Sequence, residues 1–474
     1  MSAGCVYGWA SPAELQLKSK DPPIGPESDP VSDEDISWLV AVPLLSGLFG
    51  TFVFGVLVDA VGRKRSGIIA AVPFIISWLL MAFCPGLTAL YISRIIAGIG
   101  IGGSIVVAPM LVAETASDDL RGKLGTYPAV AINSGIVLGF IVGSVLAYHL
   151  VPLFLLILPT MLIICLSRIP ESPSYLLKKD RPAEARSSLV WFRGDRRDGV
   201  VDDELDALKD AAAQNAAQSS VTFRDFICHK GTRRALIVNM GLVANQQFCG
   251  VLTVLNYAQS IFKGAGVANS AVASIIVGLL QAVCTYLSSG LINRVNRKVL
   301  LAWSNIVMGV SIAGLGGCFY AKSIGYDSPV MGWLPVVCLS TYITAFAFGI
   351  GPIPFVIMTD TFSIRVKGLA SSIVMSTQLI SAFICGKFYA PIVSLLGAHG
   401  AMFLFAGCCA VGLVFVTCYV IETRGKTLEQ ILLEYNGEQK QDGRELYLSV
   451  NGKKSHSEQI MNELNGRKNR DNQV

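Results

Sequence analysis

The sequence predicts an all-α integral membrane protein, because the chain is poor in charge, rich in apolar residues and divided into long uncharged runs. Of its 474 residues, 52% are hydrophobic and only 15% are charged, whereas about a quarter are charged in soluble domains. The mean hydropathy is +0.55. A helix of about 20 apolar residues crosses the roughly 30 Å of bilayer hydrocarbon. This composition excludes a soluble enzyme, a nucleic-acid binder and a secreted disulfide scaffold.

Eleven apolar runs are long enough to be full spans, and their continuous apolar character favours helices over barrel strands. A charged segment, 168–234, separates five runs from six. Before them, Met1–Ala10 reaches only about 15 Å as a helix, so we interpret it as the second half of a spanning helix whose first half is absent, followed by a polar loop, Glu14–Asp35. With that helix restored, the plan is six plus six. The expected full spans are Ile36–Val58, Ser66–Cys84, Leu87–Ala113, Leu124–Tyr148, Val151–Leu166, Ala235–Phe262, Ala271–Ile292, Val299–Ala321, Val330–Thr359, Gly368–Leu396 and Ala401–Val420.

The charge of the loops predicts the orientation. We expect an N-terminal bundle over 1–168, a linker with short helices over 169–234, a C-terminal bundle over 235–423 and a polar tail over 424–474. One set of alternate loops holds ten Lys and Arg residues and the other holds four, and positive loops favour the cytosol. The linker, the tail and the richer set are therefore expected in the cytosol. The richer set is Arg63, Lys64, Arg65, Arg121, Lys123, Arg294, Arg297, Lys298, Arg365 and Lys367, and the other is Lys18, Lys20, Lys263 and Lys322.

The cysteines indicate packing rather than chemistry. Most of the twelve lie in or beside apolar runs, where a free cysteine behaves as a small hydrophobe. No pair has the spacing of metal ligands. We expect no disulfide framework, no metal site and no cofactor.

Three charge patterns at cytosolic helix ends recur in the second group of spans in the same order. Such a repeat indicates parallel halves, a plan of secondary transporters in which the substrate site lies near the midplane between the halves. The matched patterns are Asp59-x-x-Gly62-Arg63-Lys64 with Asn293-x-x-Asn296-Arg297-Lys298, Glu114 before Arg121 with Asp360 before Lys367, and Glu171 with Glu422.

The carboxylates of this repeat can reach the cations and form a latch between helix ends. One exposed pair contributes roughly 0–1 kcal/mol, but several together can shift an inward/outward equilibrium whose gap is a few kcal/mol. The alternative is that the cations only anchor the topology. The latch residues are Asp59, Arg63, Lys64, Glu114, Arg121, Glu171, Arg297, Lys298, Asp360, Lys367 and Glu422.

Six motifs in register across nearly the whole chain resemble the sugar-porter branch of the major facilitator superfamily. The resemblance implies twelve helices in two bundles that work by alternating access. Shorter segments are similar to the insect trehalose/glucose facilitator subgroup, namely Gly8–Pro12, Ser174–Leu177 and Trp191–Gly194. The six motifs are Gly55-x-x-x-Asp59-x-x-Gly62-Arg63-Lys64, Arg94-x-x-x-Gly98-x-Gly100, Pro170-Glu171-Ser172-Pro173, Gln246-Gln247-x-x-Gly250, Gly351-Pro352-Ile353-Pro354 and Glu422-Thr423-Arg424-Gly425-Lys426-Thr427-Leu428-Glu429.

Counted with the partial first helix, Ala235–Phe262 is helix 7, Ala271–Ile292 is helix 8 and Gly368–Leu396 is helix 11. Four glutamines lie well inside these apolar spans. A sugar presents hydroxyl groups, and amides both donate to and accept from them. Buried amides in membranes usually face a cavity or another helix, so hydrogen bonding between helices remains the alternative. By resemblance, all four occupy sugar-binding positions, with three further residues beside them. The substrate set is Gln246, Gln247, Gln281, Gln378, Asn256, Tyr257 and Phe355.

Several ligand positions differ from the family pattern. Ala129, Leu252 and Ala347 stand where the family has polar residues, and Phe355 stands where it has tryptophan. These replacements, with the short first helix, motivate two alternatives to sugar transport. One is a non-transporting sugar sensor or inactive isoform, and the other is a carrier of a less polar solute.

Energy coupling and hinge motion are predicted from a few positions. Proton-driven relatives place an aspartate in helix 1 near the helix 4 arginine, but here that position is Ala10, which leaves Arg94 without a carboxylate partner and favours uniport. An unpaired arginine must face the bundle interior. Gly351, Pro352 and Pro354 weaken helix 10 and are the expected gate hinge. We therefore expect a multi-pass transporter, not an enzyme, in the cell membrane, with a small sugar and the lipid bilayer as its partners.

Overall fold

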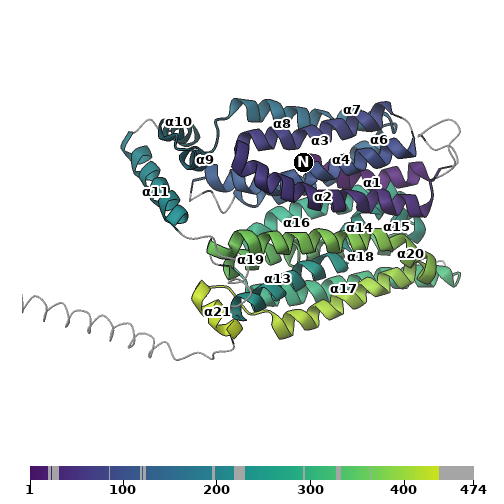
Figure 1. Cartoon of the computed structure of the whole chain (residues 1–474). Coiled ribbons are helices and arrows are strands. Elements are labelled where there is room, and N and C mark those ends of the chain that lie inside the picture. The colour runs from purple at the N-terminus through teal and green to yellow at the C-terminus, as the bar shows by residue number, and fades with distance from the viewer. Residues whose placement is uncertain are drawn as a thin grey trace, which may run out of the picture.

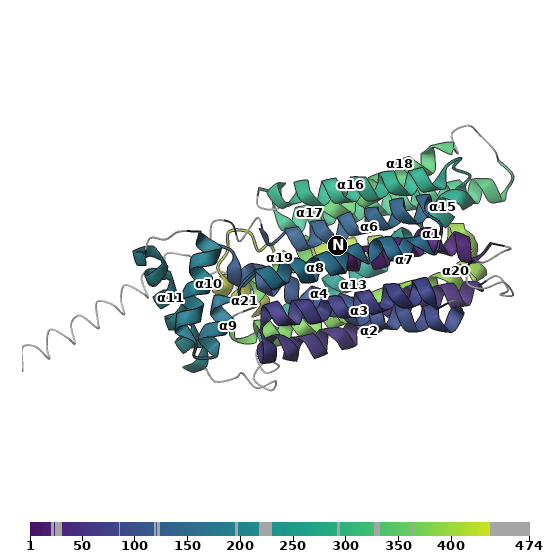
Figure 2. The same cartoon turned by 90° about the horizontal axis from the view of Figure 1, so that it is seen from above.

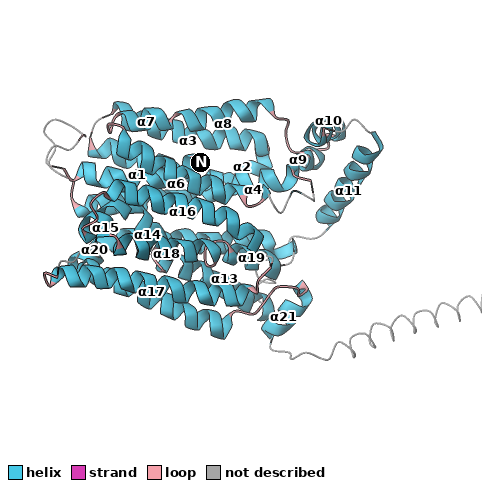
Figure 3. Cartoon of the chain, turned by 180° about the vertical axis from the view of Figure 1, so that it is seen from behind, coloured by secondary structure: helices cyan, strands magenta, loops and turns pink. Residues whose placement is uncertain are grey.

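The computed structural model describes residues 1–19, 23, 31–84, 86–117, 120, 124–194, 198–217, 230–291, 294–326, 332–362 and 364–436. Within these ranges all regular structure is helical (Figure 3). Several features named from the sequence lie outside them: the tail beyond residue 436, the residues Lys20, Arg121, Lys123 and Asn293, and the side chains of Arg365 and Lys367.

The helices before the linker form the N-terminal half, the upper layer in Figure 1. The spans that the sequence predicted are present, and most extend a few residues further at their ends because charged and polar residues there continue the helix. The elements are α1 (Ser2–Leu17), α2 (Asp33–Val61), α3 (Arg63–Phe83), α4 (Leu87–Thr115), α6 (Tyr127–Val145), α7 (Leu150–Leu155) and α8 (Ile157–Arg168).

The linker contains three helices at one end of the molecule (Figure 1): α9 (Pro173–Lys178), α10 (Pro182–Arg193) and α11 (Asp198–Ala217). They share a small apolar core, to which Leu176, Leu189 and Leu205 contribute. Arg186 pairs with Asp202 at 2.7 Å between α10 and α11, and this hydrogen bond holds the pKa of the exposed Asp202 carboxyl below its usual value.

The helices after the linker form the C-terminal half, the lower layer in Figure 1. A last helix, α21 (Leu428–Asn436), packs beside it and buries Tyr435, whose phenol pKa burial raises to about 12. The remaining elements are α13 (Lys230–Phe248), α14 (Val251–Asn256), α15 (Ala258–Ala265), α16 (Ser270–Leu291), α17 (Arg297–Ser323), α18 (Leu334–Phe348), α19 (Ile353–Thr361) and α20 (Ile364–Tyr419).

The outer surface of both halves is apolar, as a bilayer requires. Val56, Val145, Val310 and Val411 are each at least 70% exposed, and water would make such a surface unstable. Within the described ranges, ten helical segments are long and apolar enough to cross a membrane. One of them, α20, joins two spans at Gly397, whose φ of +74° breaks the helix. The eleven full spans predicted from the sequence are therefore present.

The sequence placed the end of the first helix too early. We expected a polar loop from Glu14, but α1 continues to Leu17 and includes both Pro12 and Glu14. The helix continues because the Glu14 carboxylate has partners for both oxygens. One oxygen pairs with Lys18 one turn later, at 2.7 Å, and the other accepts a hydrogen bond from Ser260 of the C-terminal half. The first described residues lie beside the middle of α6, where the carbonyl of Met1 approaches Gly135.

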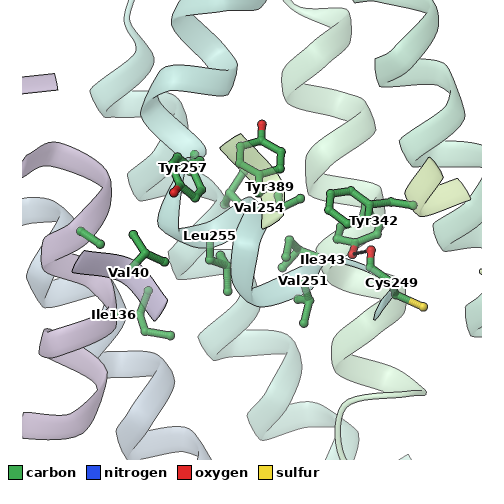
Figure 4. Packing of buried hydrophobic residues seen from close by; sticks show 14 of the residues in the cluster. Val40, Ile136, Cys249, Val251, Val254, Leu255, Tyr257, Tyr342, Ile343 and Tyr389 are labelled. Carbon is green, nitrogen blue, oxygen red and sulfur yellow. Dashed lines mark hydrogen bonds between the residues drawn. The ribbon is translucent and has the colours of Figure 1, made fainter. Parts of the chain in front are cut away.

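Several spans that looked continuous in the sequence are broken. Helix 6 divides into α7 and α8 close to Pro159, which has no N–H to donate. Helix 7 comprises α13, α14 and α15. It breaks at Gly250, where φ is +87°, and the Tyr342 hydroxyl donates to the freed carbonyl of Cys249 at 2.6 Å (Figure 4). Helix 10 breaks between α18 and α19, at the glycines and prolines where the sequence predicted a hinge.

The two halves meet mainly along two helix pairs, α2 with α20 and α6 with α16 (Figure 2), and α1 also contacts α14 and α15. Small residues permit both contacts. Gly386 of α20 lies against Val40 and Ala41 of α2, and Gly278 of α16 lies against Phe140 of α6. We call the end that carries α9–α11 the linker end and the opposite end the distal end.

Candidate functional site

Three of the predicted glutamines form one hydrogen-bonded network where the breaks of helices 7 and 10 meet. The amide nitrogen of Gln246 donates to the carbonyls of Ile350 and Gly351 at 3.1 and 2.7 Å. Its oxygen accepts from the amide nitrogens of Gln247, at 3.2 Å, and Gln378, at 3.0 Å. The sequence could not foresee these contacts, because the carbonyls are available only where the helix 10 backbone departs from regular hydrogen bonding.

Unpartnered buried oxygens belong to three of the predicted site residues. Gln247 Oε1, Gln281 Oε1 and the Tyr257 hydroxyl have no hydrogen-bond partner among the described residues. Each of these side chains is at least 94% buried. A buried polar atom without a partner is costly, so these atoms suit a polar ligand or water.

An aromatic group lies beside the break of helix 7. The ring of Tyr257 lies 4.6 Å from that of Tyr389 (Figure 4), and the Tyr389 ring stacks on Phe405 with centroids 6.2 Å apart. Of the other predicted site residues, Asn256 is buried at the end of α14, and Phe355 is partly buried and packs on the main core. Figure 4 also places Val40 and Ile136 of the N-terminal half close to this region.

Arg94 is buried inside the N-terminal half, as the sequence predicted. Its guanidinium donates to the carbonyls of Leu39 and Val6, each at 3.0 Å, and lies 4.9 Å from the centre of the Trp9 ring. Only 2% of the residue is exposed. Carbonyl oxygens and an aromatic face therefore take the place of a carboxylate in compensating this buried charge.

At the linker end of the N-terminal half, Arg63 is the centre of a charged cluster. Its guanidinium donates to Glu114 at 2.7 and 3.0 Å and lies 3.4 Å from Asp59. It also covers the ring of Tyr175, and the hydroxyl of Ser172 donates to the second oxygen of Glu114. Arg63 is only 2% exposed and Glu114 16%, so this pair is buried, whereas Asp59 is 55% exposed and lies at the surface.

The matching cluster in the C-terminal half has the same plan. Arg297 pairs with Asp360 and donates to the Thr423 hydroxyl at 2.8 Å. These residues correspond to Arg63, Glu114 and Ser172 of the first half. The Arg297 side chain is 13% exposed, against 2% for its counterpart, so the second cluster is the less buried of the two.

The third acid of the repeat caps a helix in each half. Glu171 accepts from the first two backbone N–H groups of α3 at 2.8 and 2.9 Å, and Glu422 accepts from those of α17 at 3.2 and 3.0 Å. These N–H groups have no partner within the helix, and the helix dipole favours a negative charge there. Lys64 and Lys298 then bond carbonyls of the neighbouring helix, at Ser167 and Thr417.

The distal end holds polar contacts between the halves that the sequence did not reveal. Lys387 of α20 donates to the Ser37 hydroxyl of α2 at 3.0 Å, lies 3.6 Å from Glu34 and sits 4.3 Å from the centre of the Trp38 ring. Only the mid-helix lysine itself was visible in the sequence, because its three partners lie some 350 residues away along the chain.

A second distal contact joins α1 to α15. The carboxylate of Glu14 accepts from the Ser260 hydroxyl at 2.6 Å, and the Ser11 hydroxyl accepts from the backbone N–H of Gln259 at 3.0 Å. The Gln259 amide also donates to the Ser144 hydroxyl of α6 at 2.8 Å. Because helix 7 is broken, the start of α15 offers a backbone N–H that a continuous helix would have used internally.

The comparisons with known proteins agree with this architecture. Residues 6–435 match the family described as Sugar (and other) transporter. The facilitated trehalose transporter Tret1 of Drosophila yakuba is 35% identical over 429 residues, which are 90% of this chain and 49% of that protein. Tret1 of Culex quinquefasciatus is 33% identical over 91% of this chain and 82% of its own length. The chain thus spans about half the length of the Drosophila relatives it matches.

Solved structures with the same fold include the xylose transporter XylE from E. coli. Its inward-open conformation superposes with a TM-score of 0.73 and 22% identity, covering 91% of this chain and 97% of that chain. The form bound to 6-bromo-6-deoxy-D-glucose gives a TM-score of 0.70. The two matched halves and the buried amide network thus define a multi-pass membrane protein of the major facilitator class. More specifically, the chain belongs to the sugar (and other) transporter family.

Proposed function

We propose that this chain is a facilitative uniporter that carries a sugar such as trehalose or glucose across the cell membrane by alternating access. The observation that carries the proposal is the amide network around Gln246, in which Gln247 Oε1 has no partner among the described residues, together with the aromatic side chains at the break of helix 7. Polar hydrogen bonds and ring faces are what a sugar requires. The two Tret1 relatives, which are named as trehalose transporters, support the choice of substrate.

The site residues are proposed as follows. Gln247, Gln281, Gln378 and Tyr257 offer hydrogen bonds to the sugar, while Gln246, Asn256 and Phe355 complete the predicted set around them. A few hydrogen bonds of about 0.5–1.5 kcal/mol net each give binding in the millimolar range. A weakly held sugar can leave on the opposite side of the membrane.

The proposal of uniport rests on Arg94 and Ala10. In the proton-driven relatives that the chain resembles, an aspartate occupies the position of Ala10. Here the Arg94 charge is compensated by two carbonyls and the Trp9 ring. Glu14, one turn beyond Ala10, is occupied by Lys18 and Ser260. No mid-membrane carboxylate of the described residues therefore faces Arg94 as a proton acceptor.

Gating and orientation complete the proposal. The bundles 1–168 and 235–423 act as the moving bodies, with 169–234 between them and the tail 424–474 on the cytosolic side. The clusters around Arg63 and Arg297 each join helix ends within one bundle, so we expect them to keep each bundle rigid as it moves. The break at Gly351, Pro352 and Pro354 is the hinge.

Uptake of radiolabelled trehalose and glucose into vesicles that contain the full chain tests this function. We expect saturable flux that a proton uncoupler leaves unchanged. Abolition by the uncoupler would overturn uniport, and a correctly inserted chain without saturable flux would favour the sensor alternative. The Gln247→Ala variant should raise the apparent transport constant several-fold, and an unchanged constant would remove Gln247 from the site.

A further inference from the structure

Glu14 is a carboxylate near the distal end of α1 that is buried where the two halves meet. Its side chain is only 4% exposed. One oxygen lies 2.7 Å from the ammonium group of Lys18, and the other accepts a hydrogen bond from the Ser260 hydroxyl of α15 at 2.6 Å. Glu14 also borders a cavity of about 10 Å³ that is otherwise lined by apolar residues of α1 and α2, which is room for at most about one water molecule. The carboxylate is therefore poorly hydrated.

The charges around Glu14 do not balance. Lys18 lies 2.7 Å from Glu14 and 2.6 Å from Asp33, so one cation serves two carboxylates. Asp33 is 76% exposed and water stabilises its charge, so the excess negative charge is costly only at Glu14. The phenol groups of Tyr257 and Tyr389, which are within electrostatic range of Glu14, are neutral and add no positive charge.

Opening of the distal end would change the surroundings of Glu14 in a defined way. Lys18 and Asp33 belong to the same half as Glu14 and stay with it. Ser260 belongs to the other half, so water replaces its hydroxyl group when the halves part. Full hydration stabilises a carboxylate more than one hydroxyl does. The protonated acid keeps the Ser260 contact in the closed form, because its carbonyl oxygen still accepts a hydrogen bond.

We propose that Glu14 is a proton-sensitive element of the distal closure, whose carboxylate takes up a proton from water as the distal end closes over it and returns that proton when the end opens. The inference rests on the proposed alternating access and adds a regulation to it. By linkage, the form with the greater affinity for protons gains stability as the pH falls. Acid on the distal side therefore favours closure and slows the entry of sugar from that side.

The position of Glu14 keeps this proton separate from sugar transport. In alternating access the distal end is closed over Glu14 whenever the linker end is open. A proton that Glu14 took from the distal side is therefore held until that side opens again, and it leaves by the same route. No proton crosses the membrane with the sugar, so the pH sensitivity is compatible with uniport.

The other distal groups that titrate do not produce this response. Glu34 lies 3.6 Å from Lys387 across the half interface, but it is 77% exposed, and its protonation would weaken that contact and favour opening. Asp35 is in electrostatic range of the same lysine and acts in the same direction. His149 and His399 can gain charge near neutral pH, but their ring contacts lie within one half.

Spin labels on the distal tips of the two halves test the proposal, with the full chain in lipid nanodiscs and without sugar. The pH is lowered from about 7.5 to about 5.5, a range above the ordinary glutamate pKa of about 4.3. We expect the ratio of closed to open distal ends to rise at least about threefold. Glu14→Gln carries a neutral amide that still accepts from Ser260, so its ratio should be high at both pH values. Glu34→Gln, the matched control, should keep the rise.

Each outcome decides the proposal. A ratio in the unmodified chain that stays constant or falls on acidification would overturn it, and so would a Glu14→Gln variant that rises as the unmodified chain does. If that variant does not fold, infrared spectroscopy of the unmodified chain takes its place: acidification should produce the carbonyl band of a protonated, shielded carboxyl group, and absence of the band would reject the idea. The labels need no sugar, so missing sugar flux would reject the proposed function alone.

Discussion

At the linker end, the charged clusters around Arg63 and Arg297 join helices of one half, whereas at the distal end, Lys387 and Glu14 join the two halves. The first kind of contact makes each half a firm body. The second kind holds the bodies together at the distal end, while a separate hydrogen bond from Asn133 of α6 to Thr285 of α16, at 2.8 Å, joins them toward the linker end. The two ends therefore have different tasks: the linker-end clusters move with their half, and the distal contacts must break whenever that end opens.

The largest effect is expected at the linker end. Arg63→Ala should lower the free energy of unfolding by about 3–5 kcal/mol, because it leaves Glu114 without its partner inside a buried network. Arg297→Ala, its matched variant in the second half, should cost only about 1–3 kcal/mol, because that pair is more exposed. Unfolding of the two purified variants in detergent measures the difference. Equal losses would mean that burial does not separate the two clusters.

Breaking the distal contact should change conformation rather than stability. Lys387→Met removes the hydrogen bond to Ser37 and the cation–π contact with Trp38, about 1–2 kcal/mol together, and so should favour distal opening roughly tenfold. Spin labels on the distal tips of the two halves measure this opening. Lys322→Met is the control, because Lys322 bonds Gly264 within one half. An equal response in both variants would refute the distinction between the ends.

A smaller shift in the same direction is expected for Ser260→Ala. It removes one donor to Glu14, which keeps its bond to Lys18, so the change should be about 0.5–1.5 kcal/mol. Combined with Lys387→Met, the two effects should add, since the contacts share no partner. Strong non-additivity in the label distances would indicate that the two contacts open as one unit.

The smallest effect is expected for an exposed pair at the linker end. Lys178 and Asp59 lie 3.1 Å apart, but both side chains are more than half exposed. Lys178→Ala should therefore change the free energy of unfolding by less than about 1 kcal/mol. A loss as large as that of Arg63→Ala would show that surface pairs contribute to the linker end as much as the buried network does.

The sequence predicted the parts of the site that depend on residue type and repeat. Arg63 with Glu114 and Arg297 with Asp360 could be matched because the charges recur in the same order at helix ends. The capping role of Glu171 and Glu422 was not visible, because it depends on which N–H groups the following helices leave free. The distal partners of Lys387 and Glu14 were also missed, since nothing local in the chain connects them.

What the sequence alone determined was the membrane-spanning helical fold, its division into two related halves and the family to which it belongs. Apolar run length and recurring charges carry that information, because the bilayer forces backbone groups to bond within helices. Only the tertiary structure decided where helices 7 and 10 break, and which amide faces which carbonyl. Those features follow from contacts between segments about 100 residues apart, as between Gln246 and Ile350, where the hydrogen-bond needs of one broken helix are met by a side chain of another.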